Sequence, residues 1–104
     1  MFIVIFITTK SAMEANKIAK KLLEERLIAC ANIVNGVRSL FWWDSKVNKT
    51  LEYLLVIKSK KSQFKKIVET VKKYHSYSVP EIIALPIIEG NDDYLNWIDE
   101  TVRN

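Results

Sequence analysis

The side chains best suited to bind a metal ion are few, and each occurs in a distinctive setting. Cys30 is the only cysteine and lies between small residues, where it can offer a soft ligand to copper or zinc. His75, the only histidine, follows a lysine-rich segment and can bind a metal or transfer a proton. Glu81 comes directly after a proline in an apolar segment, where a carboxylate needs a partner. Cys30, His75 and Glu81 are therefore the candidate metal ligands.

Each of these residues also has a structural interpretation, which the sequence leaves open. A cysteine in a strand is commonly a small buried hydrophobe, and an imidazole at the end of a helix favours the helix dipole. Glu81 can pair with a lysine such as Lys58, or it can bind a cation or ligand in a cleft between subunits. Trp42 and Trp43, near a predicted turn, can form a stacking surface for a ligand or belong to a core or an interface.

No catalytic set of nucleophile, base and acid is visible. A single histidine without a serine or cysteine placed by a motif does not indicate a hydrolase. The chain has only two glycines, which excludes a glycine-rich phosphate-binding loop, and its single cysteine excludes an internal disulfide. We expect a binding protein rather than an enzyme.

Length and composition describe one small folded domain. The chain has 104 residues, of which 49% are hydrophobic and 27% are charged, with a formal net charge of +4. This balance is typical of a globular protein, and we expect residues 1–104 to form a single domain. No apolar run approaches the roughly 20 residues of a membrane span, and the N-terminus has no basic leader or cleavage site. A cytoplasmic location without a membrane partner is expected.

Charge is distributed unevenly along the chain. Residues 1–80 contain 15 basic and 6 acidic side chains, whereas residues 81–104 contain 1 and 6. Clustered lysines attract phosphates, but lysines without arginines read bases poorly, and residues 51–58 lack the glycine motif of RNA-recognition domains. We therefore prefer a solvated helix face with charge matching between subunits, and no nucleic-acid partner. Abundant lysine and isoleucine beside a single glutamine, Gln63, are typical of a thermostable protein.

Apolar periodicity predicts the elements that position these residues. Ser11 and Glu14 form a capping box for the first helix, and Ser62 is expected to cap the second. Asn35-Gly36 predicts either a hairpin turn or a bulge in one long strand; we prefer the bulge, because residues 44–49 form a better turn. The predicted strands are 2–8, 28–43, 51–57 and 79–88, and the predicted helices are 11–26, 62–74 and 92–102. This order is that of a ferredoxin-like βαββαβ fold of the α+β class, in two layers, followed by a C-terminal helix.

The predicted strands are apolar on both faces, although both main helices of this fold cover the same face. In the first strand, Ile3, Ile5 and Ile7 alternate with other apolar side chains. A short terminal helix of about ten residues covers at most about half of a four-stranded sheet. We therefore expect an oligomer packed through the second face; the alternative is that the terminal helix and a folded-back hairpin cover it alone.

Several short segments, in order along nearly the whole chain, resemble the CutA family of divalent-cation tolerance proteins. The matching segments are Ala29-Cys30-Ala31-Asn32-Ile33, Trp43, Glu52, Lys58, His75-x-Tyr77-x-x-Pro80-Glu81-Ile82-Ile83 and Tyr94-Leu95-x-Trp97-Ile98. The resemblance implies a ferredoxin-like subunit in a homotrimer held by strand pairing between subunits. It also implies a link to copper or another divalent cation, with no settled enzyme activity.

We expect a ligand to bind at a cleft between subunits of this assembly. The expected cleft residues are Trp43, Lys58, Tyr77 and Glu81, joined by Cys30 and His75 as metal ligands. The sequence departs from copper-associated bacterial members at two positions, where Ile7 and Tyr74 stand in place of a cysteine and a histidine. The expected function is a trimeric metal-responsive or regulatory binding protein; the alternative is a structural or protein-interaction trimer with incidental metal binding.

Overall fold

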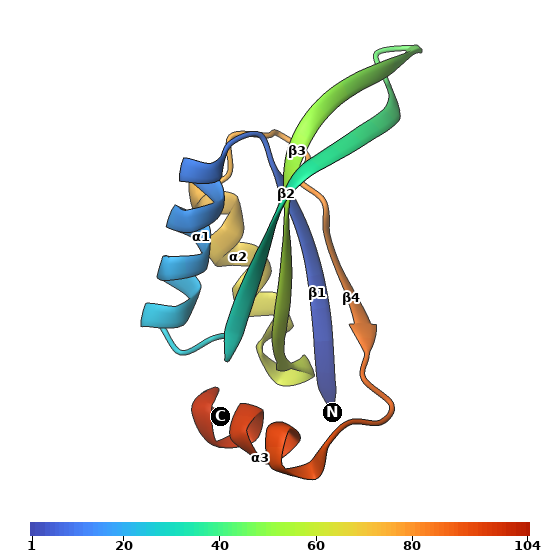
Figure 1. Ribbon diagram of the computed structural model, residues 1–104. Helices are drawn as coiled ribbons and strands as arrows, with labels where there is room; N and C mark the ends of the chain where they lie inside the picture. Colours follow the sequence, from blue (N-terminus) through green and yellow to red (C-terminus); the bar gives the residue numbers. More distant parts are fainter.

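The computed structural model describes residues 1–104 and contains the predicted elements in the predicted order (Figure 1). The four strands form one antiparallel sheet in the order β2-β3-β1-β4. The elements are β1 (Phe2–Thr9), α1 (Ala12–Glu24), β2 (Cys30–Trp43), β3 (Lys46–Lys60), the 3-10 turn η1 (Lys61–Gln63), α2 (Phe64–Tyr74), β4 (Ile82–Pro86) and α3 (Asp92–Thr101). This arrangement confirms the ferredoxin-like fold class.

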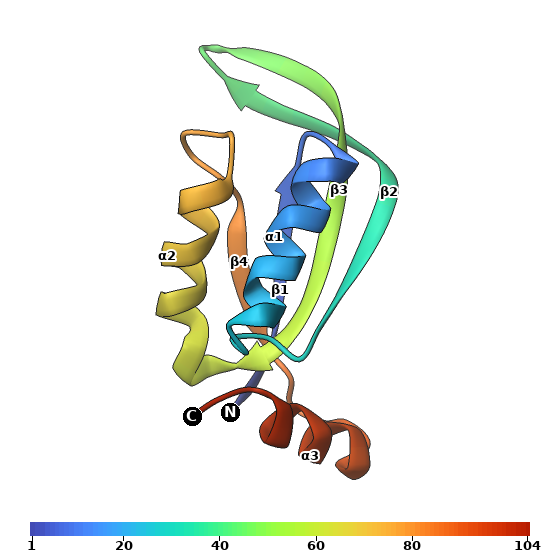
Figure 2. The ribbon, with the colours of Figure 1, turned by 90° about the vertical axis from the view of Figure 1, so that its left-hand side faces the viewer.

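Helices α1 and α2 lie side by side on one face of the sheet, as Figure 2 shows. The core between the two layers consists mainly of aliphatic side chains from β1, β3 and the two helices. Its fully buried members include Ile5, Ile7, Ile18, Leu22, Leu55, Ile57, Ile67 and Val71. The isoleucines of β1 that the alternation placed on one face thus form the centre of the core.

The predicted helix caps have different outcomes. Ser11 Oγ accepts a hydrogen bond of 3.1 Å from the Glu14 N–H, which confirms the cap of α1. The predicted Ser62 cap is wrong, because β3 continues to Lys60 and the chain enters α2 through the tight turn η1. Gln63 precedes α2 and its side chain makes no capping hydrogen bond.

The β2–β3 hairpin is longer and its turn is tighter than predicted. The turn consists of Asp44 and Ser45 alone, both with positive φ of 56° and 62°, as in a two-residue hairpin turn. Strand β3 therefore begins at Lys46, so the predicted loop 44–49 and strand start at 51 are wrong. The side chain of Asn48 donates hydrogen bonds to the carbonyls of Trp43 and Lys46 and fixes this end of the hairpin.

The Asn35-Gly36 pair forms a bulge within β2, as preferred above. The register of β2 with β3 shifts between Val34 and Val37, and Gly36 has φ of +70°. Beyond this point the sheet loses its other strands, because β1 ends where Thr9 pairs with Tyr53. Residues 37–52 thus form a two-stranded ribbon that leaves the body of the molecule (Figure 1), which we call the arm.

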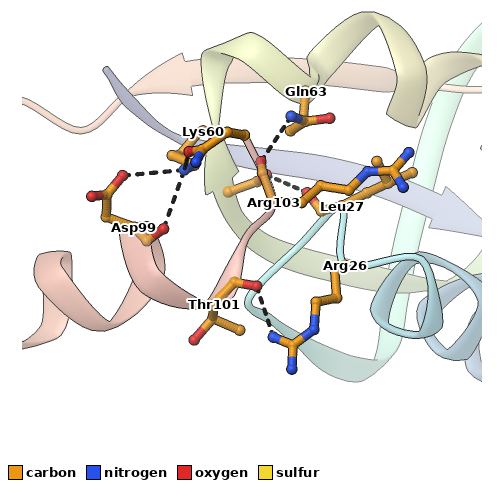
Figure 3. A network of polar contacts seen from close by, with 9 residues as sticks. Arg26, Leu27, Lys60, Gln63, Asp99, Thr101 and Arg103 are labelled. Atoms are coloured by element: carbon orange, nitrogen blue, oxygen red, sulfur yellow. Dashed lines mark hydrogen bonds and ion pairs between the residues drawn. The ribbon is translucent and has the colours of Figure 1, made fainter.

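Helix α3 lies across one end of the sheet, where a set of polar contacts helps to hold it (Figure 3). The buried Lys60 ammonium donates to Asp99 Oδ1 at 3.1 Å and to the Asn104 side chain at 3.1 Å. Gln63 donates to the Arg103 carbonyl at 2.9 Å, and Arg26 donates to the Thr101 carbonyl at 3.0 Å. These contacts fix α3 beside the N-terminal end of β1.

The second face of the sheet is only partly covered within one chain. Ile98 of helix α3 and Val102, the residue after it, belong to a small cluster that reaches Phe2 at one end of the sheet. Further along this face, Ile83 and Leu85 of β4 stay 49% and 44% exposed. The arm extends away from the sheet, so the alternative in which the hairpin folds back as a cover is wrong. Strand β4 is also shorter than predicted, because its ladder with β1 begins at Ile82.

Candidate functional site

An open cavity of about 810 Å³ lies between the arm and the segment that joins α2 to β4. In the arm, Ser39 pairs with Thr50 and Phe41 with Asn48, so these side chains share one face. The cavity is lined from the arm by Arg38, Ser39, Leu40, Phe41, Trp43, Asn48, Thr50 and Glu52, and from the body by Thr8, Tyr77, Ser78, Val79 and Glu81. An aromatic wall therefore faces polar groups and two carboxylates.

Glu52 is the most enclosed charged group of this cavity. The residue is 6% exposed, and its Oε2 accepts a hydrogen bond of 2.7 Å from the Tyr77 hydroxyl. No lysine or arginine of the chain forms an ion pair with it. Burial, and then the hydrogen bond to this carboxylate, raises the pKa of Tyr77, so the phenol stays protonated and keeps donating. A buried carboxylate with a single neutral donor is poorly compensated.

Glu81 stands on the opposite wall of the cavity and has no cationic partner either. Partial desolvation, and then the nearby Glu52 carboxylate, raises the pKa of Glu81. Two carboxylates that repel each other in one cavity favour the binding of a cation between them. Lys58, the structural partner that the sequence allowed, does not line this cavity.

His75 lies behind the cavity wall rather than in it. Its side chain is fully buried; Nε2 donates to the Thr8 carbonyl at 2.7 Å, and Nδ1 accepts the Tyr77 backbone N–H at 3.1 Å. Glu14 Oε1, from α1, is 3.5 Å from Nδ1. Both ring nitrogens are thus engaged, and His75 holds the segment that carries Tyr77 toward Glu52.

Cys30 and Lys58 lie together at the other end of the sheet. They pair directly across β2 and β3, and Lys58 Nζ contacts Asn32 Oδ1. The Cys30 sulfur is 3.6 Å from the Tyr94 hydroxyl of α3. This contact, together with burial, raises the pKa of Tyr94 to about 12. These residues form a polar contact between the sheet and α3, remote from the cavity.

The structure thus divides the predicted site residues into separate groups. Trp43, Tyr77 and Glu81 line one cavity, His75 supports its wall from behind, and Cys30 and Lys58 lie elsewhere. No group of three or more His, Cys, Asp or Glu residues is placed to hold a metal ion. The carboxylate, hydroxyl and amide oxygens of the cavity are the donors that hard divalent cations prefer, whereas copper favours imidazole and thiolate.

Sequence reasoning did not select Glu52 as a ligand-binding residue. The available signal was the one used for Glu81, a single carboxylate in an apolar strand, here between Leu51 and Tyr53. Its contact with Tyr77 joins residues 25 positions apart, which no local pattern reveals.

None of the helices is both long and apolar enough to cross a membrane.

Comparison with known proteins gives one consistent result. Residues 3–101 match the family described as "CutA1 divalent ion tolerance protein". A "Divalent-cation tolerance protein CutA" of Thermus thermophilus is 50% identical over 93% of this chain and 94% of its own length. A solved structure of CutA from Archaeoglobus fulgidus, described as periplasmic, superposes with a TM-score of 0.96 at 43% identity, over 99% of this chain and 100% of that one. A chloroplastic CutA protein of Arabidopsis thaliana is 41% identical over 98% of this chain and 56% of its own length.

Proposed function

Because the chain belongs to the CutA1 divalent ion tolerance family, we propose that it acts in tolerance to divalent cations as a homotrimeric binding protein. Its ligand site would be the cavity beside the arm, completed by a neighbouring subunit. The observation that carries the proposal is the pair of carboxylates, Glu52 and Glu81, that line this cavity without any cationic partner. A bound divalent cation would offset their repulsion and the cost of burying Glu52.

The two groups of predicted metal ligands have different parts in this proposal. Glu81 and Tyr77 serve the cavity directly, and Trp43 supplies its wall. His75 positions Tyr77, since both of its ring nitrogens are already engaged. Cys30 lies at the opposite end of the sheet and could serve this cavity only from a neighbouring subunit. Hard cations such as Mg²⁺, Mn²⁺ or Ca²⁺ therefore suit the cavity of one chain better than copper does.

Two exposed apolar surfaces support the assembly. The side of the arm that faces away from the cavity carries Trp42, Val47 and Leu51, which are 53–75% exposed because the helix layer does not reach the arm. The second face of the sheet is the other surface. A two-stranded ribbon alone is at best marginally stable in water. Contacts between unlike surfaces of identical chains form a ring when the rotation between neighbours closes, and three subunits is the number that the family resemblance implies.

Calorimetric titration of the purified assembly with Mg²⁺, Mn²⁺, Zn²⁺ and Cu²⁺ tests the site. We expect at least one cation to bind more tightly than about 100 μM, a free energy of about −5.5 kcal/mol. Glu81→Gln and Glu52→Gln should abolish this binding, while Cys30→Ser, remote from the cavity, should keep it. If no cation reaches that affinity, or if only Cys30→Ser abolishes binding, the carboxylate site is wrong.

The lysines on the outer side of the helix layer favour a second candidate function. Lys65, Lys66, Lys72 and Lys73 of α2 are all exposed and none forms an ion pair. A structural or protein-interaction trimer could present this face to an acidic partner protein, with incidental metal binding. A stoichiometric partner that is recovered with the wild type and lost when these lysines are changed to glutamate would favour this alternative.

The cytoplasmic location stays a prediction, since the relatives named above are assigned to different compartments.

A further inference from the structure

We propose that Asn35 is a site of spontaneous deamidation and that its product alters the hinge of the arm, by which we mean the bulge at residues 35 and 36 from which the arm leaves the sheet. Asn35-Gly36 is the only Asn-Gly pair in the chain, and both residues are exposed. Neither has a partner in the register of β2 with β3, which passes from the Val34–Leu54 pair directly to the Val37–Glu52 pair. The bulge therefore releases this dipeptide from the extended ladder that holds the rest of the strand.

The reaction needs only the chain and water. The backbone nitrogen of Gly36 attacks the side-chain carbonyl carbon of Asn35, and a new C–N bond closes a five-membered succinimide. The C–N bond of the side-chain amide breaks, and the proton from the Gly36 nitrogen leaves with the departing ammonia. Water then opens the ring at either carbonyl, giving aspartate or isoaspartate at position 35. No oxidant, reductant or further reactant takes part.

The surroundings of Gly36 favour ring closure. Glycine has no Cβ to hinder its own nitrogen or to restrict the backbone during the attack. Gly36 has φ of +70°, and a Cβ built at this position would meet no atom within 4 Å. The space beside the residue that supplies the attacking nitrogen is therefore open.

Other asparagines of the same hairpin lack these conditions and serve as internal controls. Asn32 is held in register opposite Val56, its side chain contacts Lys58, and the β-branched Ile33 follows it. The side-chain amide of Asn48 donates hydrogen bonds to two backbone carbonyls. The side chain of Asn35 makes no hydrogen bond, so we expect its amide to react first.

The position of the bulge gives the modification a structural consequence. The bulge lies opposite Tyr53, the residue at which β1 stops supporting the sheet. Isoaspartate inserts a methylene group into the main chain and adds a negative charge at this point. The direction of the arm, and with it the cavity wall that the arm supplies, should change. An effect on assembly rests on the proposed function; the reaction itself does not.

The first experiment follows the modification at each asparagine in the intact protein. The protein is incubated at mildly alkaline pH, and its peptides are then mapped by mass spectrometry and by enzymatic isoaspartate methylation. We expect Asn35 to convert at least about ten times faster than Asn32, a barrier difference of about 1.4 kcal/mol. Asn35→Gln should remove the fast conversion. If Asn35 converts no faster than Asn32, the proposal is overturned.

The second experiment separates the effect of the extra main-chain atom from that of the charge. The isolated isoaspartate form is compared with the Asn35→Asp variant, which has the same charge and a normal backbone. We expect faster hydrogen exchange in residues 37–52 of the isoaspartate form only. Equal exchange in the two proteins would refute the hinge effect. Because this readout needs no assembly, a wild type that proved monomeric would refute the proposed trimer and leave this test valid.

Discussion

Trp42 and Trp43 are adjacent in the arm but face opposite sides, which allows a sharp test of the proposed assembly. Trp42 lies on the apolar side with Val47 and Leu51, and it is 75% exposed in the isolated chain. Trp43 faces the cavity. We therefore expect Trp42→Ser to weaken the contact between subunits and Trp43→Ser to weaken ligand binding, with little effect of either on the protomer core.

The magnitude follows from the area that Trp42 offers to a neighbour. A tryptophan side chain buries about 150–250 Å², and at about 25 cal/mol per Å² the exposed three-quarters correspond to about 3–5 kcal/mol for each contact. A serine at position 42 would bury little apolar area. Ordering and desolvation costs offset part of the free energy that Trp42 contributes to the contact. A loss of about 3 kcal/mol per contact raises the dissociation constant by about two orders of magnitude.

Sedimentation velocity over a range of protein concentrations measures this effect directly. We expect the wild type to remain a trimer at micromolar concentration, Trp42→Ser to dissociate, and Trp43→Ser to sediment like the wild type. A Trp42→Ser variant that assembles as tightly as the wild type would refute the proposed contact through Trp42. A wild type that sediments as a folded 12.1 kDa monomer would also refute this contact.

Three further predictions concern single polar groups. The raised pKa of Glu81 means that its contribution to stability is complete below the ordinary value of 4.5 and is lost as the pH rises through the higher folded value. Glu81→Gln should therefore be more stable than the wild type at neutral pH, and urea unfolding should show this advantage vanishing in acid. Tyr77→Phe leaves the Glu52 carboxylate without its donor and should cost about 1–3 kcal/mol of unfolding free energy. Ser59→Ala deprives the Leu27 carbonyl of a buried 2.6 Å hydrogen bond and should lower the free energy of unfolding by about 1–2 kcal/mol in the same assay. If either variant is as stable as the wild type, the prediction for that variant is wrong.

Much of the fold could be predicted from the sequence because local signals and apolar periodicity agreed. Ser11 marked the start of α1, the alternating isoleucines of β1 marked the core face, and Asn35-Gly36 marked the bulge. The predicted ends of helices and strands were wrong where a weak local signal competed with pairing between strands. The ladder extends β3 back to Lys46 although the sequence there has the composition of a turn, and Ser62 has the type but not the position of a cap.

The site was less predictable because its geometry comes from contacts distant in sequence. His75 was selected for its chemistry, yet its surroundings use both ring nitrogens to hold the backbone. Cys30 and Glu81 were grouped by residue type, but the sheet places them at different ends. Glu52 reads as an ordinary strand residue until the segment from α2 brings Tyr77 against it.

The cavity and the proposed assembly depend on the same feature, the arm. One face of the arm supplies Trp43 and Glu52 to the cavity, and the opposite face offers Trp42 and Leu51 to a neighbour. A contact that fixes the arm from one side therefore reduces the freedom that a ligand must restrict on the other side. By linkage, any cation that binds the assembled form more tightly than the free chain must stabilise the assembly by the same free energy. A change that strengthens cation binding in the cavity should therefore also lower the dissociation constant of the subunits. If one of these quantities changes without the other, the two faces of the arm act independently.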